Sequence, residues 1–536
     1  LVADIAKNWG ITSAGDVVLP LTVVFVAAAV VAGVFRLVLL WASTRLSYAA
    51  GADLSIEIYR RTLYQPYRVH VARNSSTVIS GIYKVDSVLG MLKSLLALIS
   101  STVLMVFVCA ALLAIDTAVA ATAIIGFGAS YAAITWMHRR RLRHNSQDIA
   151  RESTQVHKSL QEGLGGIRDV LLDSTQPLYC NIYRQGIHVL RHAQGNNAFM
   201  AQSPRYVMEV LGMALIAVLA YGFSSRADSA GMILPVLGTL ALGAQRLLPA
   251  LQTIYAAWAT IAGNQASLAD TLELLDQPLP AEALLPPPGP LPFEHVIHFD
   301  NVRFRYHDHA PWVLDGLSFM IPKGARVGFV GSTGSGKSPA LDLLMGLLEP
   351  TQGRIMVDDQ PVSSKHRRAW QMTIAHVPQS IYLADITLAE NIAFGVPPVE
   401  IDFERVRQAA RQAQIAEFIE SLPEDYQAFV GERGVRLSGG QRQRIGIARA
   451  LYKQASVLVF DEATSALDNA TEQAVMDAIE ILGRDLTILI IAHRLTTVRR
   501  CDTIIELEHG RVVAQGPYDR LLEQSPGFQR MVLSAR

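Results

Sequence analysis

Five long apolar stretches dominate the first half of the chain. They cover residues 19–46, 88–115, 118–137, 206–223 and 232–261. A helix of about 20 apolar residues is long enough to cross the hydrocarbon core of a bilayer. Buried helices of a soluble protein are the alternative, but uncharged runs such as residues 118–137 are rare in soluble proteins. The pattern therefore predicts five membrane-spanning helices.

Two long polar segments, residues 47–86 and 138–205, lie between these apolar stretches. Each contains a helical pattern, at residues 52–63 and 149–160, so we expect the spans to continue as helices beyond the bilayer. Asn74-Ser75-Ser76 and Gly163-Leu164-Gly165-Gly166 interrupt these helical runs. The interruptions predict two tips far from the membrane, at residues 74–76 and 164–168, where a cytoplasmic domain could make contact.

Basic residues gather in the same two segments and set the orientation of the chain. They are Arg60, Arg61, Arg68, Arg73 and Lys84 in the first, and Arg139, Arg140, Arg141 and Arg143 in the second. Loops rich in Lys and Arg stay in the cytoplasm, so the chain after Ile261 should emerge there and Leu1 should lie outside. A cytoplasmic start would need one more helix before Leu1. Binding of lipid headgroups by residues 139–143 is an alternative reading, but topology alone explains that run.

The composition agrees with a partly lipid-embedded protein of several domains. The chain has 536 residues, 47 basic and 47 acidic, and is 18% charged. This length predicts two or more domains, and a mean hydropathy of +0.26 is high for a soluble protein. The zero net charge argues against attraction of the whole protein to nucleic acid. Three widely spaced cysteines, Cys109, Cys180 and Cys501, exclude a disulfide scaffold and a CxxC-type metal site.

A proline-rich segment, residues 276–292, separates the apolar half from the rest of the chain. Proline removes backbone donors and favours an extended conformation, so this segment is predicted to be a linker. The expected organisation is a transmembrane domain over residues 1–275, apparently without its first helix, and a soluble α/β domain over residues 293–536.

A glycine-rich loop near the start of the α/β domain predicts a phosphate site. It follows an apolar strand pattern at residues 327–330, precedes a helical pattern at residues 341–348, and consists of Gly331, Ser332, Thr333, Gly334, Ser335, Gly336, Lys337 and Ser338. The glycines let backbone N–H groups converge on phosphate oxygens at a helix N-terminus. Lys337 would reach the β- and γ-phosphates, and the Ser338 hydroxyl would bind Mg²⁺.

The residue after this loop is unusual. Pro339 has no N–H and biases Ser338 away from the helical region, although proline is tolerated in a first helical turn. One amide and one side-chain hydroxyl are missing near the α-phosphate. We therefore expect weaker nucleotide binding than with threonine at this position.

A second apolar strand pattern, residues 457–460, ends in the carboxylates of Asp461 and Glu462. Asp461 is placed to hold Mg²⁺, and Glu462 to polarise an attacking water as general base. Such a pair could also simply begin a helix, but together with the glycine loop it points to ATP hydrolysis.

Leu437-Ser438-Gly439-Gly440-Gln441 resembles the signature sequence of ATP-binding cassette (ABC) ATPases. Other elements of the family match in order, and their roles are implied by the resemblance. Tyr306 resembles the aromatic residue that stacks on adenine, and Gln379 the glutamine that senses Mg²⁺. Residues 465–468 resemble the D-loop, His493 the switch histidine at the γ-phosphate, and residues 431–434 a loop of exporters. Pro339 departs from the family, which usually has Thr or Ser there.

The resemblance covers nearly the whole chain and implies the fold of an ABC exporter half-transporter. Such a fold has a helical polytopic membrane domain with six helices per chain, of which five are visible in this sequence, followed by the α/β ATPase domain. In the family each nucleotide lies between the glycine loop of one domain and the signature of another. Ser438, Gly439, Gly440 and Gln441 would therefore bind ATP in a homodimer. The expected location is the plasma (inner) membrane of the cell, with the ATPase domain in the cytoplasm.

The cargo is harder to read than the ATPase. Arg36, Lys93, Glu209 and Arg246 lie within or beside the apolar stretches, and charge inside a membrane usually faces a cavity or a partner. Arg36 and Glu209 could instead lie in cytoplasmic extensions of their helices. The cationic excess of Arg36, Lys93 and Arg246 suits a candidate cavity for an amphiphile that bears phosphate or pyrophosphate.

Short sequences around residues 65–76, 162–169 and 246–250 are similar to lipid-linked oligosaccharide flippases of the ABC exporter group. The resulting hypothesis is an ATP-driven flippase for a lipid-linked oligosaccharide. An exporter of drugs or peptides is an alternative, as is a membrane protein in which ATP gates a channel or regulates a receptor. A soluble ABC ATPase that acts on nucleic acid does not fit the five predicted spans.

Overall fold

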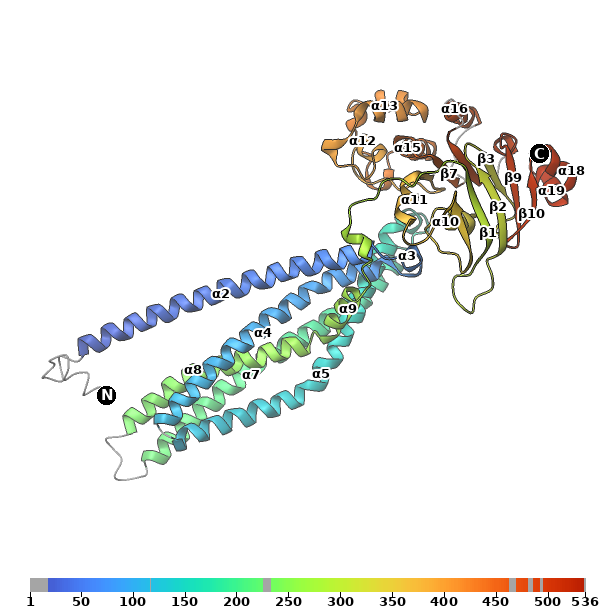
Figure 1. Cartoon of the computed structure of the whole chain (residues 1–536). Helices are drawn as coiled ribbons and strands as arrows, with labels where there is room; N and C mark the ends of the chain where they lie inside the picture. Colours follow the sequence, from blue (N-terminus) through green and yellow to red (C-terminus); the bar gives the residue numbers. More distant parts are fainter. Residues whose placement is uncertain are drawn as a thin grey trace. The chain divides into compact units, whose positions relative to one another are not determined.

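The computed structural model describes residues 18–115, 117–224, 233–461, 469–480, 485–491 and 495–534. The chain forms two compact units. The first comprises Leu1–Gln65 and His70–Pro280, and the second comprises Pro66–Val69 and Ala281–Arg536. Figure 1 shows long helices in the first unit and the sheets in the second.

Helices, most of them long, make up most of the described part of residues 18–275. They are α2 (Val18–Leu63), α3 (Tyr67–Ala72), α4 (Ser75–Ile115), α5 (Thr117–Gly165), α6 (Ile167–Leu172), α7 (Gln176–Ser224), α8 (Ile233–Ala262) and α9 (Gln265–Leu275). The 46 residues of α2 span about 70 Å at a rise of about 1.5 Å per residue, more than twice the thickness of a hydrocarbon core. The predicted continuation of the spans beyond the bilayer is therefore confirmed.

The predicted interruptions fall at or beside the observed helix ends. α4 begins at Ser75, where the Asn74 side chain accepts from the Ser76 amide at 3.0 Å and the Ser76 hydroxyl at 2.8 Å. This side chain caps the helix, so the interruption lies just before Ser75 rather than across residues 74–76. The second break lies at Gly166, between α5 and α6.

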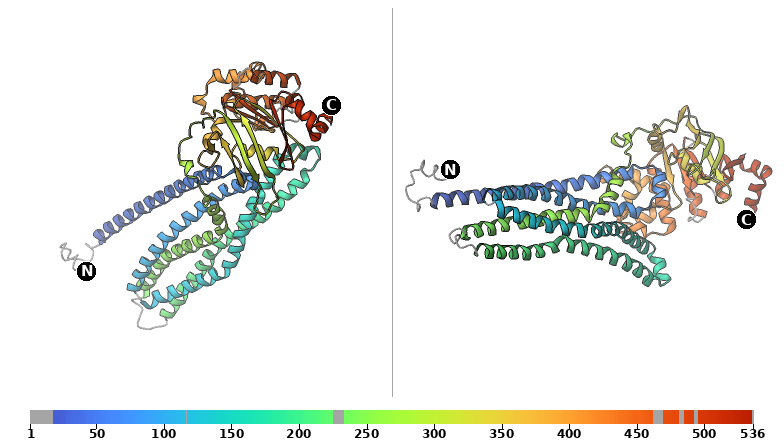
Figure 2. Two further views of the ribbon diagram at one scale, coloured as in Figure 1. Left: turned by 45° about the vertical axis from the view of Figure 1, so that its right-hand side comes forward. Right: turned by 90° about the horizontal axis from the view of Figure 1, so that it is seen from below.

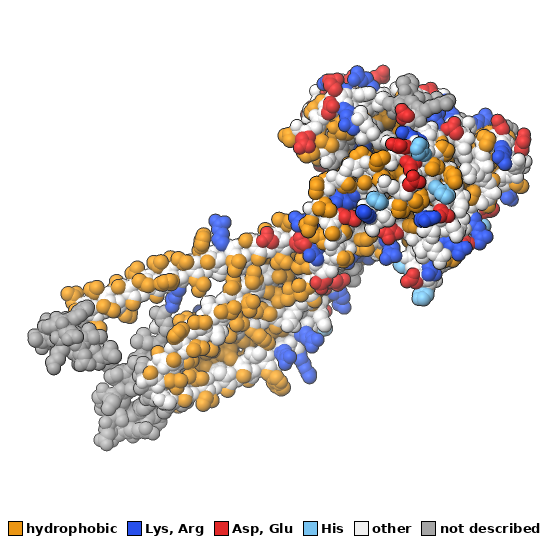
Figure 3. Space-filling model, viewed as in Figure 1, with side chains coloured by type: hydrophobic (Ala, Val, Ile, Leu, Met, Phe, Trp, Pro, Cys, Tyr) orange, Lys and Arg blue, Asp and Glu red, His pale blue; other side chains and the backbone are white. Residues whose placement is uncertain are grey.

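Two of the described helices, Val18–Leu63 and Ser75–Ala114, are long and apolar enough to cross a membrane. The other three predicted spans fall within α5, α7 and, apart from residue 232, α8, where some side chains lie outside the described residues. Hydrophobic side chains cover much of the face of the first unit seen in Figure 3. The exposed hydrophobic residues of this unit include Phe25, Phe35 and Phe107. Apolar surface of this extent marks contact with lipid or protein.

Helices α4, α5, α7 and α8 run lengthwise and pack against one another (Figures 1 and 2). The buried residues of α2, by contrast, all lie in its C-terminal half, where Ile58 packs with Val85 of α4 and Leu274 of α9. Among the described residues, the apolar N-terminal half of α2 thus buries no side chain in the first unit.

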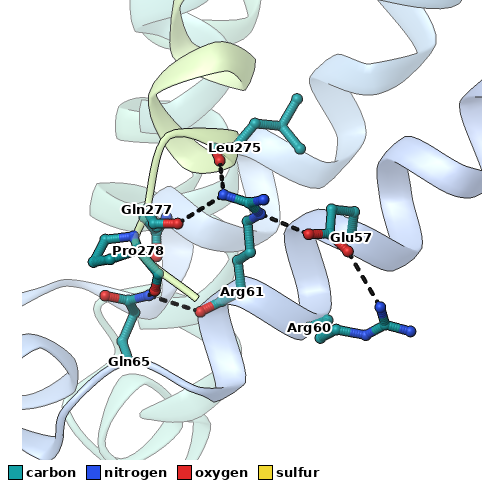
Figure 4. Close-up of polar contacts among 7 residues, drawn as sticks. All are labelled: Glu57, Arg60, Arg61, Gln65, Leu275, Gln277 and Pro278. Carbon is teal, nitrogen blue, oxygen red and sulfur yellow. Dashed lines mark hydrogen bonds and ion pairs between the residues drawn. The ribbon is translucent and has the colours of Figure 1, made fainter. Parts of the chain in front are cut away.

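The C-terminal end of α9 is held by α2 (Figure 4). The Arg61 guanidinium donates through Nη1 to the carbonyls of Leu275 at 2.5 Å and Gln277 at 2.9 Å. Its Nε donates to Glu57 at 2.7 Å. The Gln65 amide extends the contact by donating to the Pro278 carbonyl at 3.0 Å. Carbonyls at a helix C-terminus lack intrahelical partners, so Arg61 caps α9 and fixes the start of the proline-rich segment.

A polar cluster around the buried Lys84 fixes the middle of α9. The Lys84 ammonium donates to Asp270 of α9 at 2.5 Å and to the Thr154 hydroxyl of α5 at 3.0 Å. Lys84 is only 6% exposed, and a buried charge must be paired to be tolerated. The cluster therefore holds α4, α5 and α9 together at one point.

Pro204 lies inside α7 and leaves one carbonyl of that helix without its usual amide partner. A helical amide bonds the carbonyl four residues earlier, so the missing N–H frees the carbonyl of Met200. The buried Tyr255 hydroxyl of α8 donates to this carbonyl at 3.1 Å. Because that hydroxyl uses its proton on Met200, the His138 Nδ1, at 2.7 Å, must donate to Tyr255. Burial, and then Arg141, lowers the pKa of His138, which favours the neutral ring.

The second unit contains two sheets. The antiparallel sheet has the order β2-β1-β4-β5, and the larger sheet has the order β10-β9-β3-β8-β7-β6. The strands are β1 (Val296–Phe304), β2 (Leu314–Pro322), β3 (Arg326–Val330), β4 (Gln352–Val357), β5 (Gln360–Pro361), β6 (Ile374–Val377), β7 (Val457–Asp461), β8 (Thr487–Ile491), β9 (Thr503–Glu508) and β10 (Arg511–Gly516). All five residues of β8 are buried, as expected for a parallel strand covered on both faces.

Short helices surround the sheets. The α-helices are α10 (Lys337–Leu344), α11 (Arg367–Thr373), α12 (Leu388–Ile392), α13 (Phe403–Gln412), α14 (Ala416–Glu420), α15 (Gly439–Tyr452), α16 (Asn469–Glu480), α17 (Leu495–Val498), α18 (Tyr518–Gln524) and α19 (Pro526–Ser534), and the 3₁₀ turns are η1 (Ala281–Leu284), η2 (Pro398–Glu400), η3 (Asp425–Gln427) and η4 (Glu432–Gly434). The helix predicted at residues 341–348 is wrong at both ends. It begins directly after the glycine loop and stops before Gly346, whose φ of +66° ends it.

We predict that Tyr255→Phe lowers the unfolding free energy by about 1–3 kcal/mol, because the buried Met200 carbonyl loses its donor. The loss should be smaller in a Pro204→Ala background, where the new amide can reach the same carbonyl. Thermal unfolding in detergent of the wild type, the two single variants and the double variant gives the coupling free energy between residues 204 and 255.

Tyr206→Phe is the matched control, since Tyr206 is 66% exposed and its hydroxyl should contribute little. An equal loss for Tyr255→Phe in both backgrounds would contradict the assignment of this hydroxyl to the proline-freed carbonyl.

Candidate functional site

The segments that carry the predicted motifs lie at the carboxyl edge of the larger sheet. β3, β8, β7 and β6 pair in parallel, with Phe329 opposite Ile491 and Phe460 opposite Val377. The glycine loop follows β3, Asp461 ends β7, and Gln379 lies two residues after β6. Ligands bind at the carboxyl ends of such strands, so residues far apart in the sequence converge here.

The glycine loop folds around the side chain of Lys337. This residue is 7% exposed, and its ammonium donates to the carbonyls of Gly331 at 2.8 Å and Ser332 at 2.9 Å. Gly331 has a φ of +146°, and a Cβ there would overlap the Leu507 carbonyl. Gly336 has a φ of +104° and precedes α10 without a side-chain cap. The loop thus needs glycine at both places, and it holds a cation beside the open N-terminus of a helix.

These residues fit a nucleotide phosphate. A Cβ at Gly334 would meet nothing within 4 Å, so the backbone there is open to a ligand. The Ser335 hydroxyl is buried and has no hydrogen-bond partner among the described residues. Open amides, an ammonium and a helix N-terminus form an anion site. Thr333 and Ser338 are exposed beside it.

Pro339 is the third residue of α10, which begins at Lys337 despite the bias of proline on Ser338. The amide at this position has no partner within the helix, which explains why the helix tolerates proline. The first helical bond runs from the Ala340 amide to the Gly336 carbonyl at 3.0 Å. The cost of Pro339 should therefore fall on the ligand rather than on the fold.

Oxygen donors suited to Mg²⁺ lie at the same edge. Asp461 is partly exposed at the end of β7, and Ser338 and Gln379 are exposed. Carboxylate, hydroxyl and amide oxygens are hard ligands of the kind that Mg²⁺ prefers. This donor set fits the metal that normally accompanies ATP.

A further carboxylate, Asp342 of α10, belongs to this site and was missed by the sequence analysis. Burial, and then the charge of Asp461, raises the pKa of Asp342 to about 6. The two carboxylates are thus close enough to repel each other, and together they would attract a cation. A signal was available, because Asp342 lies four residues after Ser338 and so on the same face of the helix.

Tyr306 follows β1 and is 37% exposed. Its ring stands edge-on to Phe304, with centroids 5.0 Å apart. Burial, and then Asp342, raises the pKa of Tyr306. The neutral phenol at physiological pH keeps an apolar ring available for stacking.

The signature residues begin α15. The Ser438 hydroxyl accepts from the Gln441 amide at 3.2 Å, and the Gln441 side chain accepts from the Ser438 amide at 2.8 Å. This capping box fixes the first turn of the helix, while Ser438 and Gly439 stay exposed. The exposed N-terminus of α15 therefore offers a second anion site, which is open at the surface.

Several predicted residues lie outside the described residues or apart from this site. Glu462, residues 465–468 and His493 are outside the described residues. Residues 431–434 include η4, and the adjacent Val435 is 76% exposed.

The charges predicted for a cargo cavity have different surroundings. Arg36 is exposed on α2, and Lys93 of α4 lies with its ammonium 3.9 Å from the centroid of the Tyr48 ring. Glu209 pairs with Arg205 at 2.9 Å on α7. The side chain of Arg246 lies outside the described residues.

Comparison with known proteins identifies the ATPase. Residues 314–465 match the family model described as ABC transporter. The ATP-dependent lipid A-core flippase of Chromohalobacter salexigens is 43% identical over 232 residues, which are 43% of this chain and 40% of the relative. The flippase of the same name from Cupriavidus metallidurans is 42% identical over 253 residues, 46% of this chain and 42% of the relative.

The mycobactin import ATP-binding/permease protein IrtB of Mycolicibacterium thermoresistibile is 45% identical over 232 residues, 43% of this chain and 39% of the relative. The chain thus matches about two-fifths of the length of these curated relatives. A solved bacterial Atm1-family ABC exporter with ATP bound has a TM-score of 0.80 and 28% identity, and the match covers 91% of this chain and 86% of that chain.

The second unit therefore contains an ABC transporter ATPase domain. The chain as a whole has the fold of an Atm1-family ABC exporter, with a helical transmembrane domain followed by the ATPase domain. The predicted fold class is confirmed. Similarity to lipid-linked oligosaccharide flippases in particular stays a prediction.

We predict that Pro339→Thr raises the affinity for ATP by about threefold to tenfold, since one amide and one hydroxyl are restored near the phosphates. Equilibrium binding of ATP in EDTA measures the change without hydrolysis. Pro339→Ala restores the amide alone and should fall between the two. Equal affinities for all three proteins would show that residue 339 does not contact the nucleotide.

Proposed function

We propose that two copies of this chain form an ATP-driven exporter or flippase that moves an amphipathic lipid across the inner membrane by alternating access. The observation that carries the proposal is the pairing of two anion sites in each chain. One is the glycine loop around Lys337, and the other is the exposed signature at Ser438. Because each chain has one of each, two chains can complete two ATP sites.

Different residues of the chain bind ATP and catalyse its hydrolysis. Tyr306 stacks on the adenine, while Lys337 and the loop amides from Gly331 to Ser338 hold the phosphates. Ser338, Asp461 and Gln379 would hold Mg²⁺, which neutralises phosphate charge when bound. Glu462 takes the proton of the attacking water, and His493 contacts the γ-phosphate.

Closure of two ATPase domains does work only if the helical domain moves with them. The capping of α9 by Arg61 supports this coupling, because it ties the start of the segment predicted as a linker, residues 276–292, to α2. The buried cluster of Lys84, Thr154 and Asp270 ties α9 to α4 and α5. The α9 helix can thus transmit displacement to three helices of the membrane domain.

A lipid is the favoured cargo. Relatives named lipid A-core flippases support this class, although the name of IrtB shows that similar ATPase domains accompany other cargoes. The basic residues Arg36, Lys93 and Arg246 favour a phosphate-bearing amphiphile, with a lipid-linked oligosaccharide as first candidate. Export of drugs or peptides is the alternative within the class, and gating of a channel by ATP is the alternative outside it.

Purified protein in liposomes tests the proposal. We expect directional movement of a labelled polyprenyl-pyrophosphate oligosaccharide that requires hydrolysis, and stimulation of the ATPase by this lipid above that by lipid A or drugs. Glu462→Gln is the control, since it should bind ATP but lose both hydrolysis and movement. Movement supported by ATP binding alone would contradict a pump and favour a gate. Stimulation by drugs but not by the lipid would contradict the cargo.

A further inference from the structure

A buried hydrogen bond joins two helices of the ATPase domain that both follow motif segments. The Thr497 hydroxyl of α17 donates to the Glu472 carboxyl of α16 at 2.6 Å. Glu472 is 5% exposed and Thr497 is 4% exposed. The O···O distance lies within the normal range for a hydrogen bond between two oxygen atoms.

Buried apolar residues lie next to Glu472 and Thr497 in both helices. Val475 and Met476 of α16, with Val498 of α17 and Cys501, belong to the same hydrophobic cluster. A carboxylate in such surroundings is tolerated only when its hydrogen-bonding capacity is used. The position of Thr497 is therefore strongly constrained by Glu472, whereas an apolar pair would allow the two helices to slide.

Glu472 and Thr497 each lie a few residues after a predicted motif of the ATP site. Glu472 lies in the first turn of α16, four residues after Asp468, the last residue of the predicted D-loop. Thr497 lies in α17, four residues after the predicted switch residue His493. Each helix is preceded by a short connection from a buried strand, β7 or β8, and these strands pair in parallel.

A second contact joins the same segments on the surface. Arg500 donates to Asp477 of α16 at 2.8 Å, with 28% and 53% of the two side chains exposed. Exposed ion pairs contribute little to rigidity. The buried bond is the one that can fix the spacing of the two helices.

We propose that Glu472 and Thr497 are positioning residues for ATP hydrolysis. Their bond fixes α17 against α16, the two helices that follow the predicted switch histidine and the predicted D-loop in the chain. Neither residue touches the nucleotide, and loss of the bond slows turnover without weakening the contacts of Tyr306 and Lys337 that bind ATP. The inference rests on the proposed ATP hydrolysis and adds two residues to its machinery.

The test compares steady-state ATP hydrolysis by the full chain in liposomes for wild type, Thr497→Val, Thr497→Ser and Glu472→Gln. We expect kcat to fall about tenfold for Thr497→Val, while KM and equilibrium ATP binding change less than twofold. Thr497→Ser should restore kcat to within twofold, since it keeps the hydroxyl. Glu472→Gln keeps an acceptor without the charge and should be intermediate.

Gln473→Ala is the matched control, because Gln473 is exposed on the same turn of α16 and should leave kcat unchanged. Thr497→Val and Thr497→Ser with equal kcat, or a Thr497→Val protein that loses thermal stability but keeps its kcat, would overturn the proposal. Absence of hydrolysis by the wild type would instead reject the proposed function itself.

Discussion

Parallel pairing of β3, β8, β7 and β6 is the constraint on which the candidate site depends. Each of these strands is short and largely buried, so its register is fixed by side chains packed on both faces. Parallel strands end at a common edge, and this edge receives the glycine loop, Asp461 and the segment that leads to Gln379. The buried ammonium of Lys337 and the carboxylate of Asp342, both on α10, therefore lie at the same edge as the carboxylate of Asp461, which is far away in the sequence.

The helical domain obeys a different constraint. Its long helices expose apolar side chains, and polar contacts join one helix to another. Two of these contacts concern a helix end or a break, Arg61 at the end of α9 and Tyr255 at the carbonyl freed by Pro204. A third joins Lys84 to the middle of α9. Each satisfies a backbone or charged group that would otherwise be costly in an apolar setting. Such contacts fix where the helices can bend and where they must move together.

Most of the successful predictions came from local sequence patterns. The strands at β3 and β7 and the glycine loop follow from runs of adjacent residues, and the helical domain follows from the length of its apolar stretches. Groups paired through tertiary structure escaped prediction. Nothing near Thr497 points to Glu472, and nothing near Pro204 points to Tyr255. Asp342 was missed for a related reason, since a single Asp on a helix is usually solvated until its neighbours are known.

A composite ATP site shared by two chains is the central claim, and mixed pairs of variant chains test it most directly. Chains carrying Lys337→Ala or Ser438→Arg are co-expressed with different tags, and mixed pairs are isolated by both tags. A shared site predicts that this pair hydrolyses ATP, because one glycine loop and the opposite signature remain intact. It also predicts that wild type paired with the Lys337→Ala/Ser438→Arg double variant is inactive. The reverse pattern, with the first pair inactive and the second active, would mean that each chain completes its own site.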